Sequence, residues 1–306
     1  MNVVNKPLVS VITCCYNSVM FLQKTIDSVR EQTFQDFEYI FIDGGSTDGT
    51  LEIINFYVND EPEKFKLVHQ KTKGLMRARN IGIQCATGRY ICFIDGDDIW
   101  HTQKLARQIA FYEQHLEYGL VFANCVNIDE EGIIIPGTGK KNTPDLTIFG
   151  LFKHCYIPNP TVMVKKEIYD EIGCFDETLP YSEDWDMWLR IAIKYPLAYI
   201  PDVLAWYRVH RNNMSTGSLK HYDYQVHVMK KIAALEPKLS TLLPKRLGSI
   251  YMVKARKQLK ELDKQGARES FAKAKQVFPQ RTLVYLLGIF LTYLPRNLLL
   301  RFVREN

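Results

Sequence analysis

Three carboxylates stand within four residues in the segment Asp95-Gly96-Asp97-Asp98, which follows the apolar run at residues 90–94. Carboxylates this close repel one another unless a cation lies among them. Divalent ions such as Mg²⁺ and Mn²⁺ prefer oxygen ligands, and diphosphates share them. Gly96 would let a bulky ligand approach the backbone. The alternative is an acidic turn that caps the next helix, but the position after a strand favours a metal site.

A glycine-rich turn and a basic segment are two further candidates. The segment 43–49 reads DGGSTDG, in which glycines would admit a nucleobase while Asp43 accepts an N–H from its edge. A plain turn explains the same residues. Residues 73–80 contain Arg77 and Arg79, and guanidinium groups suit phosphate oxygens. A solvated helical face is the alternative, but the place directly before the Asp95 strand favours a functional role.

A third acidic cluster, Ser182-Glu183-Asp184-Trp185-Asp186, places carboxylates beside tryptophan. A partly desolvated carboxylate can act as a general base. The same pattern is typical of a helix N-terminus capped by Ser182, with core tryptophans. The segment 208–211 (RVHR) includes His210, and its chemistry alone assigns that histidine no role.

Alternating strands and helices must position these clusters. Apolar runs of strand length occupy residues 8–14, 39–42, 65–69, 90–94 and 120–126, and helical spacing occupies 20–32, 48–57, 75–85 and 101–115. Short connections between them predict an α/β fold, with a mostly parallel sheet between helices. Ligands of such sheets bind beyond the carboxyl ends of the strands, where Tyr16, Asp43 and residues 95–98 would meet.

Composition and charge narrow the class of protein. The 306 residues are 46% apolar and 24% charged, as in globular proteins. Seven cysteines without a CxxC pair indicate a reducing compartment, and the start of the chain has no pattern of a secretory signal, so we expect a cytoplasmic protein. Residues 245–306 carry 14 Lys/Arg and four Asp/Glu, which predicts contact with an anionic partner.

Four segments together resemble family 2 of the glycosyltransferases, which has the GT-A fold. They read VSVITCCYN, FIDGGSTDGT, KGLMRARNIGIQCATGRYICFIDGDD and SEDWDMWLR, and the similarity covers approximately residues 7–215. The resemblance implies an inverting transfer of a sugar from a nucleotide-sugar donor, most often a UDP-sugar, to an acceptor hydroxyl. Many members have Pro or Ser before the YN pair. Here Cys14-Cys15 stands there, which predicts sensitivity to thiol reagents.

The resemblance also implies roles for single residues on the donor side. Tyr16 would pack on the nucleobase and Asp43 would bond its edge. Arg77 would lie near the base or diphosphate with Arg79 as its neighbour. Asp95 would hold the ribose, beside Gly96.

The resemblance also implies which residues bind a metal and which acts as the catalytic base. Asp97 would bind a divalent metal, Mn²⁺ or Mg²⁺, with Asp98 assisting and His210 completing the coordination. Asp184 would deprotonate the acceptor hydroxyl, with Glu183 beside it.

The C-terminal region has a different character. We expect a GT-A catalytic domain at residues 1–218 and a helical, basic extension at 219–306. The apolar run 282–294 would be about 20 Å long as a helix, shorter than the roughly 30 Å of a bilayer core. Residues 282–303 are therefore interpreted as an interfacial helix on the inner face of the cell membrane, near a saccharide or lipid-linked acceptor. The alternative is a helix that packs on the catalytic domain.

Three other functions are alternatives to sugar transfer. A nucleic-acid-binding protein would explain the basic region but not the carboxylates, and residues 245–275 interleave few aromatics with their charges, so no nucleic acid is expected. A metal-dependent nucleotidyltransferase would share the sheet and the acidic site. An inactive binding module would not need so complete a site.

Overall fold

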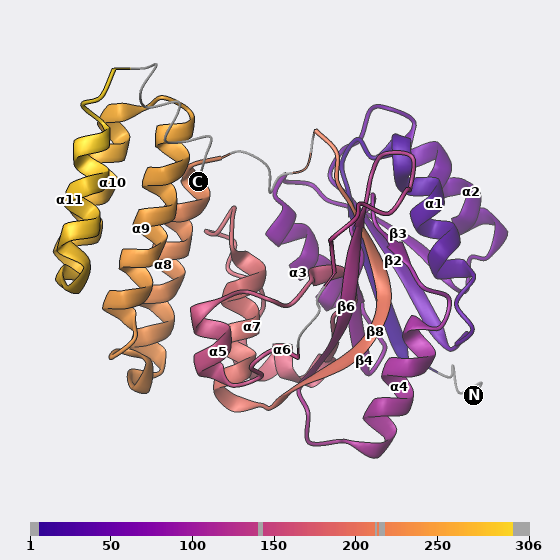
Figure 1. Cartoon of the computed structure of the whole chain (residues 1–306). Coiled ribbons are helices and arrows are strands. Elements are labelled where there is room, and N and C mark those ends of the chain that lie inside the picture. The colour runs from indigo at the N-terminus through magenta and orange to yellow at the C-terminus, as the bar shows by residue number, and fades with distance from the viewer. Residues whose placement is uncertain (1–5, 140–142, 212, 214–217, 296–306) are drawn as a thin grey trace. The chain divides into compact units, whose positions relative to one another are not determined.

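The computed structural model describes residues 6–139, 143–211, 213 and 218–295 (Figure 1). The chain divides into two compact units, Met1–Asn213 and Met214–Asn306. Each unit is described by itself below.

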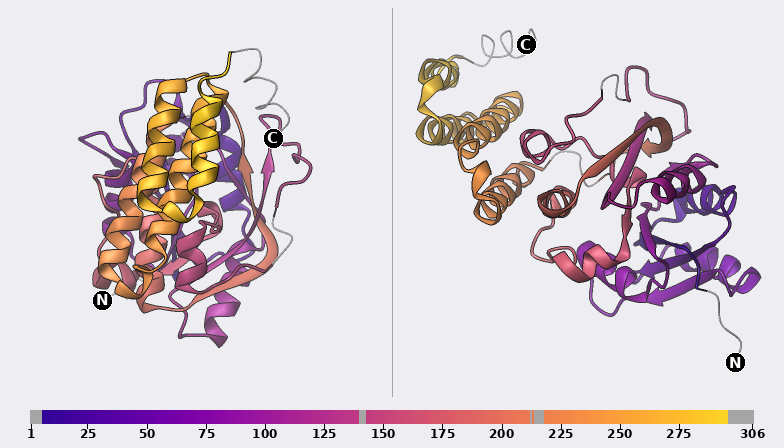
Figure 2. Two further views of the ribbon diagram at one scale, coloured as in Figure 1. Left: turned by 60° about the vertical axis from the view of Figure 1, so that its left-hand side comes forward. Right: turned by 90° about the horizontal axis from the view of Figure 1, so that it is seen from below.

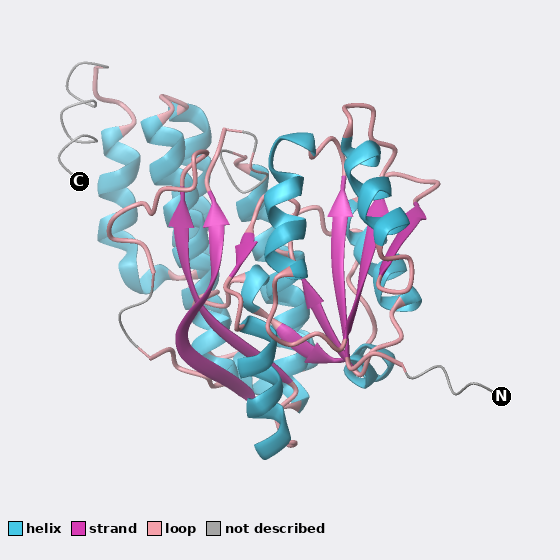
Figure 3. Ribbon diagram, turned by 90° about the vertical axis from the view of Figure 1, so that its right-hand side faces the viewer, coloured by secondary structure: helices cyan, strands magenta, loops and turns pink. Residues whose placement is uncertain are grey.

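One mixed sheet forms the centre of the first unit. Its described strands are β1 (Val9–Cys15), β2 (Phe37–Asp43), β3 (Phe65–His69), β4 (Tyr90–Phe93), β5 (Ile99–Trp100), β6 (Leu120–Ile128), β7 (Met163–Lys165) and β8 (Leu197–Arg208). Their order in the sheet is β3-β2-β1-β4-β7-β6-β8-β5. The long strands β6 and β8 curve along their length (Figure 3).

The strands that carry the polar clusters are parallel and end at one edge. β1 pairs with β2 and with β4 in parallel, and β2 pairs with β3 in parallel. Cys15 lies opposite Asp43, and Ile12 lies opposite Phe93, so the turns after β1, β2 and β4 are neighbours. β7 runs antiparallel between β4 and β6, while β6 and β8 are parallel. The expected α/β fold with a mostly parallel sheet is confirmed.

Helices cover both faces of the sheet, as Figure 1 shows. One face carries α1 (Val19–Arg30), α2 (Thr50–Asp60) and α4 (Lys104–Gln114); the other carries α3 (Leu75–Cys85), α5 (Ile148–Lys153), α6 (Lys166–Ile172) and α7 (Glu183–Lys194). Alternation along β1 explains this, because Val9 and Val11 join the core under α1, α2 and α4. Ile12 instead meets Gly82 of α3, where an added Cβ would lie 2.5 Å from its Cγ2.

Glu38 fixes the other end of β2. Its Oε1 accepts hydrogen bonds from the Ser10 hydroxyl at 2.6 Å and from the Thr87 amide and hydroxyl at 2.6 and 2.7 Å, and Lys66 donates to Oε2. Burial alone raises a carboxyl pKa, but these donors lower the pKa of Glu38 to about 2. The carboxylate thus ties β1, β2, β3 and the turn before β4 together.

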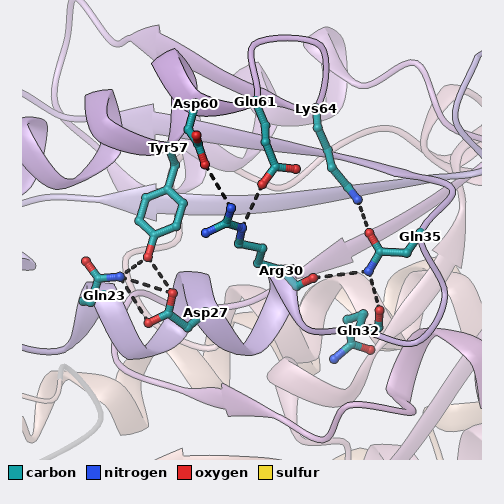
Figure 4. Close-up of polar contacts among 9 residues, drawn as sticks. All are labelled: Gln23, Asp27, Arg30, Gln32, Gln35, Tyr57, Asp60, Glu61 and Lys64. Atoms are coloured by element: carbon teal, nitrogen blue, oxygen red, sulfur yellow. Dashed lines mark hydrogen bonds and ion pairs between the residues drawn. The ribbon is translucent and has the colours of Figure 1, made fainter.

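Polar side chains join the solvent side of α1 to α2 and the chain beyond it (Figure 4). Arg30 donates from Nε to Glu61 at 2.7 Å and from Nη2 to Asp60 at 2.9 Å, and the Tyr57 hydroxyl donates to Asp27 at 2.5 Å. The Arg30 pairs are solvent-exposed, and such pairs contribute little, about 0–1 kcal/mol each. Burial of Leu22, Ile26 and other core residues must therefore hold α1 in place.

Two helices begin later than the expected ranges 48–57 and 101–115. α2 begins at Thr50, and Gly49 occupies its N-cap position with a φ of 96°. Asp48 accepts the backbone N–H groups of Thr50 at 3.1 Å and Val19 at 3.2 Å, and so ties the starts of α1 and α2 together. The helix expected from residue 101 begins at Lys104, because the short strand β5 and a turn precede it.

The second unit is helical in its described part. It contains α8 (Lys220–Leu235), α9 (Leu243–Lys260), α10 (Lys264–Val277) and α11 (Thr282–Leu291). Each helix packs on the next, and they run alternately up and down (Figure 2). The core that α9, α10 and α11 share contains Ala255, Leu259, Ala267, Phe271, Ala274 and Tyr285. In the described part of the chain, every helix is too short or too polar to cross a membrane.

Candidate active site

A buried arginine joins two carboxylates that are far apart in the sequence. Arg79 of α3 donates from Nη2 to Asp95 Oδ1 at 3.3 Å and from Nη1 to Glu183 Oε1 at 3.1 Å. Asp95 follows β4, and Glu183 is the first residue of α7. The guanidinium lies over the rings of Phe93 and Phe175. The structure therefore brings the donor-side acid and the expected base-side acid to opposite ends of one cation.

Asp97 and His210 form the second contact of the site. His210 Nε2 lies 2.8 Å from Asp97 Oδ2, and Phe21 of α1 packs against the imidazole with ring centroids 5.2 Å apart. Burial and the nearby charge of Asp95 raise the pKa of Asp97, whereas His210 lowers it. The resemblance paired these two residues, and the structure places them in contact across 113 positions of sequence.

Asp98 has a different environment from Asp97. It is fully buried, and its Oδ1 accepts the backbone N–H of Arg208 at 3.0 Å. Burial and the charge of Asp97 raise its pKa well above the ordinary value. Its second oxygen, Oδ2, is buried without a hydrogen-bond partner among the described residues. Asp98 therefore has a structural contact through Oδ1, and its expected part in metal binding stays a prediction.

The expected metal ligands do not form a complete set. Among the described residues, no three His, Cys, Asp or Glu side chains converge in a group able to hold a metal. Asp97 and His210 supply one carboxylate and one imidazole, so a cation there would need further ligands from its substrate or from water.

The start of α7 holds the acidic pair Glu183 and Asp184. Ser182 is at the N-cap position, as expected, but its side chain makes no capping bond and its φ is 61°. A positive φ is uncommon for a residue with a Cβ and often marks a functional site. Asp184 Oδ1 accepts the Trp185 N–H at 2.6 Å. Burial and the charge of Asp184 raise the pKa of Glu183 to about 7, against the opposing effect of Arg79.

The turns after β1 and β2 contain the expected nucleobase residues. Tyr16 is exposed, and Lys73 Nζ lies 4.5 Å from its ring centroid and 3.0 Å from its hydroxyl. Asp43 is buried, and its Oδ2 accepts the N–H groups of Gly45 at 2.9 Å and Ser46 at 3.2 Å. The turn interpretation of Asp43 is thus correct, and a base-binding role would be additional to it.

Arg77 and Gly96 are the two remaining expected donor residues. Arg77 is exposed and faces Glu177, with Nε 3.8 Å from its carboxylate, so Arg79 rather than Arg77 is the arginine between Asp95 and Glu183. Gly96 packs closely on α1 and the residue before it, because an added Cβ would lie 3.3 Å from Ser18 Cβ.

Sequence reasoning gave no specific role to Asn159, which lies just before β7. Its Nδ2 is 3.5 Å from Asp95 Oδ2. Only the antiparallel insertion of β7 beside β4 brings this segment there, and the local sequence does not reveal that pairing.

The thiols near the site are not activated. Burial raises the pKa of Cys14 to about 12, and burial raises the pKa of Cys15 well above its ordinary value. Because the thiolate is the reactive form, the structure argues against the expected sensitivity to thiol reagents.

The parallel sheet, the acidic turn after β4 and the acids at the start of α7 define a GT-A-type transferase. The sequence profile described as Glycosyl transferase family 2 matches residues 10–173. The chain belongs to glycosyl transferase family 2 and is a glycosyltransferase.

Two relatives of this chain illustrate the family. One is the Escherichia coli UDP-Glc:alpha-D-GlcNAc-diphosphoundecaprenol beta-1,3-glucosyltransferase WfaP, 32% identical over 228 residues, with 74% of this chain and 86% of that protein covered. Another is an uncharacterized glycosyltransferase of Methanocaldococcus jannaschii, 31% identical over 235 residues, with 74% and 79% covered.

Two solved structures share the fold. Staphylococcus aureus TarS 1–349 matches with a TM-score of 0.65 and 20% identity, covering 89% of this chain and 81% of that one. The mannosyltransferase PcManGT from Pyrobaculum calidifontis, solved with GDP-Man and Mn²⁺, matches with a TM-score of 0.63 and 19% identity, covering 95% and 82%. At these identities the likeness shows the GT-A fold alone.

Proposed function

We propose that this glycosyltransferase transfers a sugar from a nucleotide-diphosphate sugar, in the first instance a UDP-sugar, to an acceptor hydroxyl with inversion at the anomeric carbon. We assign this reaction to a catalytic domain at about residues 1–218 and regard residues 219–306 as a separate helical region. The observation that carries the proposal is the Asp95–Arg79–Glu183 contact, because it joins a donor-side turn to the acidic start of α7.

On the donor side, the residues after β1 and β2 would bind the nucleoside. Tyr16 offers an exposed ring on which a base can stack, and Lys73 can move from that ring towards an anionic or carbonyl oxygen. Asp43 would accept from the base edge with a lone pair that its turn leaves available. Asp95 would bind the ribose from its place beside Arg79.

Asp97 and His210 could supply two ligands of a divalent cation, which is part of the set that such an ion needs. The two ligand atoms are an oxygen and a nitrogen. Burial and then the charge of Asp95 raise the pKa of Asp97, and a cation bound there would stabilise its ionised form. Mn²⁺ or Mg²⁺ bound there would offset the charge that develops on the departing diphosphate. Diphosphate oxygens and water would complete its coordination.

On the acceptor side, Asp184 would take the proton from the attacking hydroxyl. Glu183 anchors the start of α7 to Arg79, so the neighbouring Asp184 is held at a fixed position relative to Asp95. Arg79 stays within the protein as a fixed cation, so it needs no reorganisation when charge moves. Attack from the side opposite the nucleotide inverts the anomeric configuration. The acceptor is a saccharide or a lipid-linked saccharide, as the activity named for the E. coli relative suggests.

An assay of nucleoside diphosphate release tests this assignment. A panel of UDP-, GDP- and dTDP-sugars is incubated with the full chain and with Asp184→Asn, and Glu171→Gln in α6 serves as an exposed-carboxylate control. Loss of a general base lowers such rates by about 10²–10⁴-fold. Release from one donor that Asp184→Asn abolishes and Glu171→Gln retains supports the proposal. Equal rates in Asp184→Asn, or release of pyrophosphate from nucleoside triphosphates instead, contradict it.

We also propose that the helical region places the enzyme on an anionic membrane surface at the cytoplasmic face. α11 packs inward through Tyr285 and Gly288 and turns apolar side chains outward: Leu283, Leu287, Phe290 and Tyr293 are 83, 60, 60 and 68% exposed. The spacing of four and three residues places Leu283, Leu287 and Phe290 on one face of α11, and Tyr293 follows in the turn after the helix. The packed side of α11 meets α9 and α10. Its exposed apolar side chains support the membrane interpretation of this run.

Basic side chains border that apolar face. The Arg268 guanidinium lies 4.9 Å from the Tyr293 ring centroid, Lys264 donates to the Leu294 carbonyl at 2.5 Å, and exposed Arg281 precedes α11. An apolar strip with a cationic border suits the interface of a bilayer that contains anionic lipids. The part of the expected helix beyond residue 295 lies outside the described residues.

A further inference from the structure

Arg208 is a fully buried arginine at the end of β8, two residues before His210. Among the described residues, no carboxylate oxygen lies within ion-pair distance of its guanidinium. Backbone carbonyls and the ring of Phe21, 4.7 Å from Cζ, contact the guanidinium, and its charge also lowers the pKa of the nearby Asp98 carboxyl against the larger, opposite effect of burial. A buried charge without an ion pair is costly, so an apolar side chain would serve packing at least as well.

Two hydrogen bonds of Arg208 go to the turn after β4, which contains Asp97 and Asp98. Its Nε donates to the Asp97 carbonyl at 2.9 Å, and its backbone N–H donates to Asp98 Oδ1 at 3.0 Å. One residue therefore holds the main chain of Asp97 and the side chain of Asp98. Because Asp98 is locked in this way, the carboxylate of Asp97 alone is left to face His210.

The same guanidinium also bonds the turn that follows β6. Nη1 donates to the carbonyls of Asp129 at 2.9 Å and Glu130 at 3.0 Å, in the turn that follows β6. That turn closes with the Gly132 N–H donating to the Asp129 carbonyl at 3.1 Å. Arg208 thus connects the turn after β4, the segment after β8 and the turn after β6.

His210 is positioned through the same residue. The ring of Phe21 contacts both the Arg208 guanidinium and the His210 imidazole, and the centroids of the two rings are 5.2 Å apart. Asn213 donates to the Arg208 carbonyl at 3.0 Å and accepts the His210 N–H, which fixes the short segment that contains the histidine. Both members of the Asp97–His210 pair are therefore oriented by contacts that include Arg208.

We propose that Arg208 is a positioning residue that sets the distance and orientation of Asp97 and His210 for a shared divalent cation. Its side-chain hydrogen bonds go to protein carbonyls. Partners that orient metal ligands typically change metal affinity by 10- to 100-fold when they are replaced. The inference rests on the proposed function, because Asp97 and His210 are a metal pair only there.

The test is calorimetric titration of the full chain with Mn²⁺ and UDP, together and separately. The variants are Arg208→Lys and Arg208→Met. Arg208→Lys keeps the charge and much of the bulk, but it loses the separate N–H donors that bond the two turns. Lys104→Met is the matched control, since Lys104 is an equally buried cation that contacts Gln108 and the Trp100 ring. Thermal unfolding of each variant identifies a temperature at which all of them are folded, and the titrations are done there. If Arg208→Met does not fold, the Mn²⁺ affinity of Arg208→Lys tests the positioning role.

We expect both folded Arg208 variants to bind Mn²⁺ in the presence of UDP at least tenfold more weakly. UDP binding in EDTA should change less than twofold, because Tyr16 and Asp43 are held by other contacts. Unchanged Mn²⁺ affinity in Arg208→Lys, or an equal loss in Lys104→Met, overturns the positioning role. A wild-type protein whose UDP binding does not respond to Mn²⁺ instead overturns the metal assignment in the proposed function.

Discussion

Glu183 titrates close to neutral pH in this fold, because burial and the charge of Asp184 disfavour its ionised form. The pKa in the folded protein, about 7, exceeds the ordinary glutamate pKa of 4.5. Glu183 therefore retains its proton up to about pH 7, and the unfolding free energy falls as pH rises from about 4.5 to about 7. Ionisation completes the charge pair with Arg79 that anchors α7.

We therefore expect the rate of sugar transfer to rise with pH through a midpoint near 7, because only ionised Glu183 forms that pair. Glu183→Gln should remove this midpoint and lower the rate at pH 8 by roughly tenfold, since a neutral amide binds the guanidinium more weakly. The measurement is kcat/KM from pH 5.5 to 8.5 for wild type and Glu183→Gln. A variant that keeps the same midpoint would assign the titration to another group.

At the residue scale, the sequence predicts which acidic residues belong to the site but not which cation they contact. Asp95, Asp97 and Glu183 are predicted site residues, and the structure brings Asp95 and Glu183 together. The sequence names Arg79 only as a neighbour of Arg77, whereas the structure places it between Asp95 and Glu183. That arrangement depends on contacts across 16 and 104 positions, which local spacing does not encode.

At the element scale, α11 exposes several large apolar side chains, among them Leu283, Leu287 and Phe290. Its outward face is bordered by cationic side chains, so we expect binding to vesicles that contain anionic phosphatidylglycerol and weaker binding to neutral phosphatidylcholine. Raising the salt concentration should reduce it, because the charge attraction is screened.

The double variant Leu287→Ser/Phe290→Ser should weaken vesicle binding by roughly thirtyfold, which corresponds to about 2 kcal/mol of lost apolar transfer. Phe56→Ser in α2 is the matched control, since Phe56 is 63% exposed and Phe290 is 60% exposed. Flotation of full-length protein with vesicles measures the effect. Equal flotation of the double variant and wild type would argue that this face does not contact lipid.

Elements with strong local patterns were predictable. The strand at Phe65–His69 and the helix at Leu75–Cys85 match the expected bounds, because their apolar periodicity is complete within each segment. β5 was missed because two residues carry no periodicity. The antiparallel insertion of β7 was missed because strand pairing is decided by the whole sheet.

At the scale of the whole molecule, the sheet explains why residues from four separate segments form one site. The turns after β1, β2 and β4 share the edge at which parallel strands end, and α7 begins near the turn after β4, as the shared contact with Arg79 shows. The alternation of strands and helices predicted that edge from the sequence. The order of the strands beyond β4, which brings β8 and His210 to Asp97, could not be read from it.

The central claim is that one edge of this sheet binds a nucleoside diphosphate together with a divalent cation. Calorimetric titration with UDP, GDP and dTDP, in Mn²⁺ or Mg²⁺ and then in EDTA, tests it most directly with wild type and Asp97→Ala. We expect one nucleotide to bind in the presence of metal and to bind at least tenfold more weakly after EDTA or Asp97→Ala. A folded protein that binds none of the three nucleotides would contradict the account.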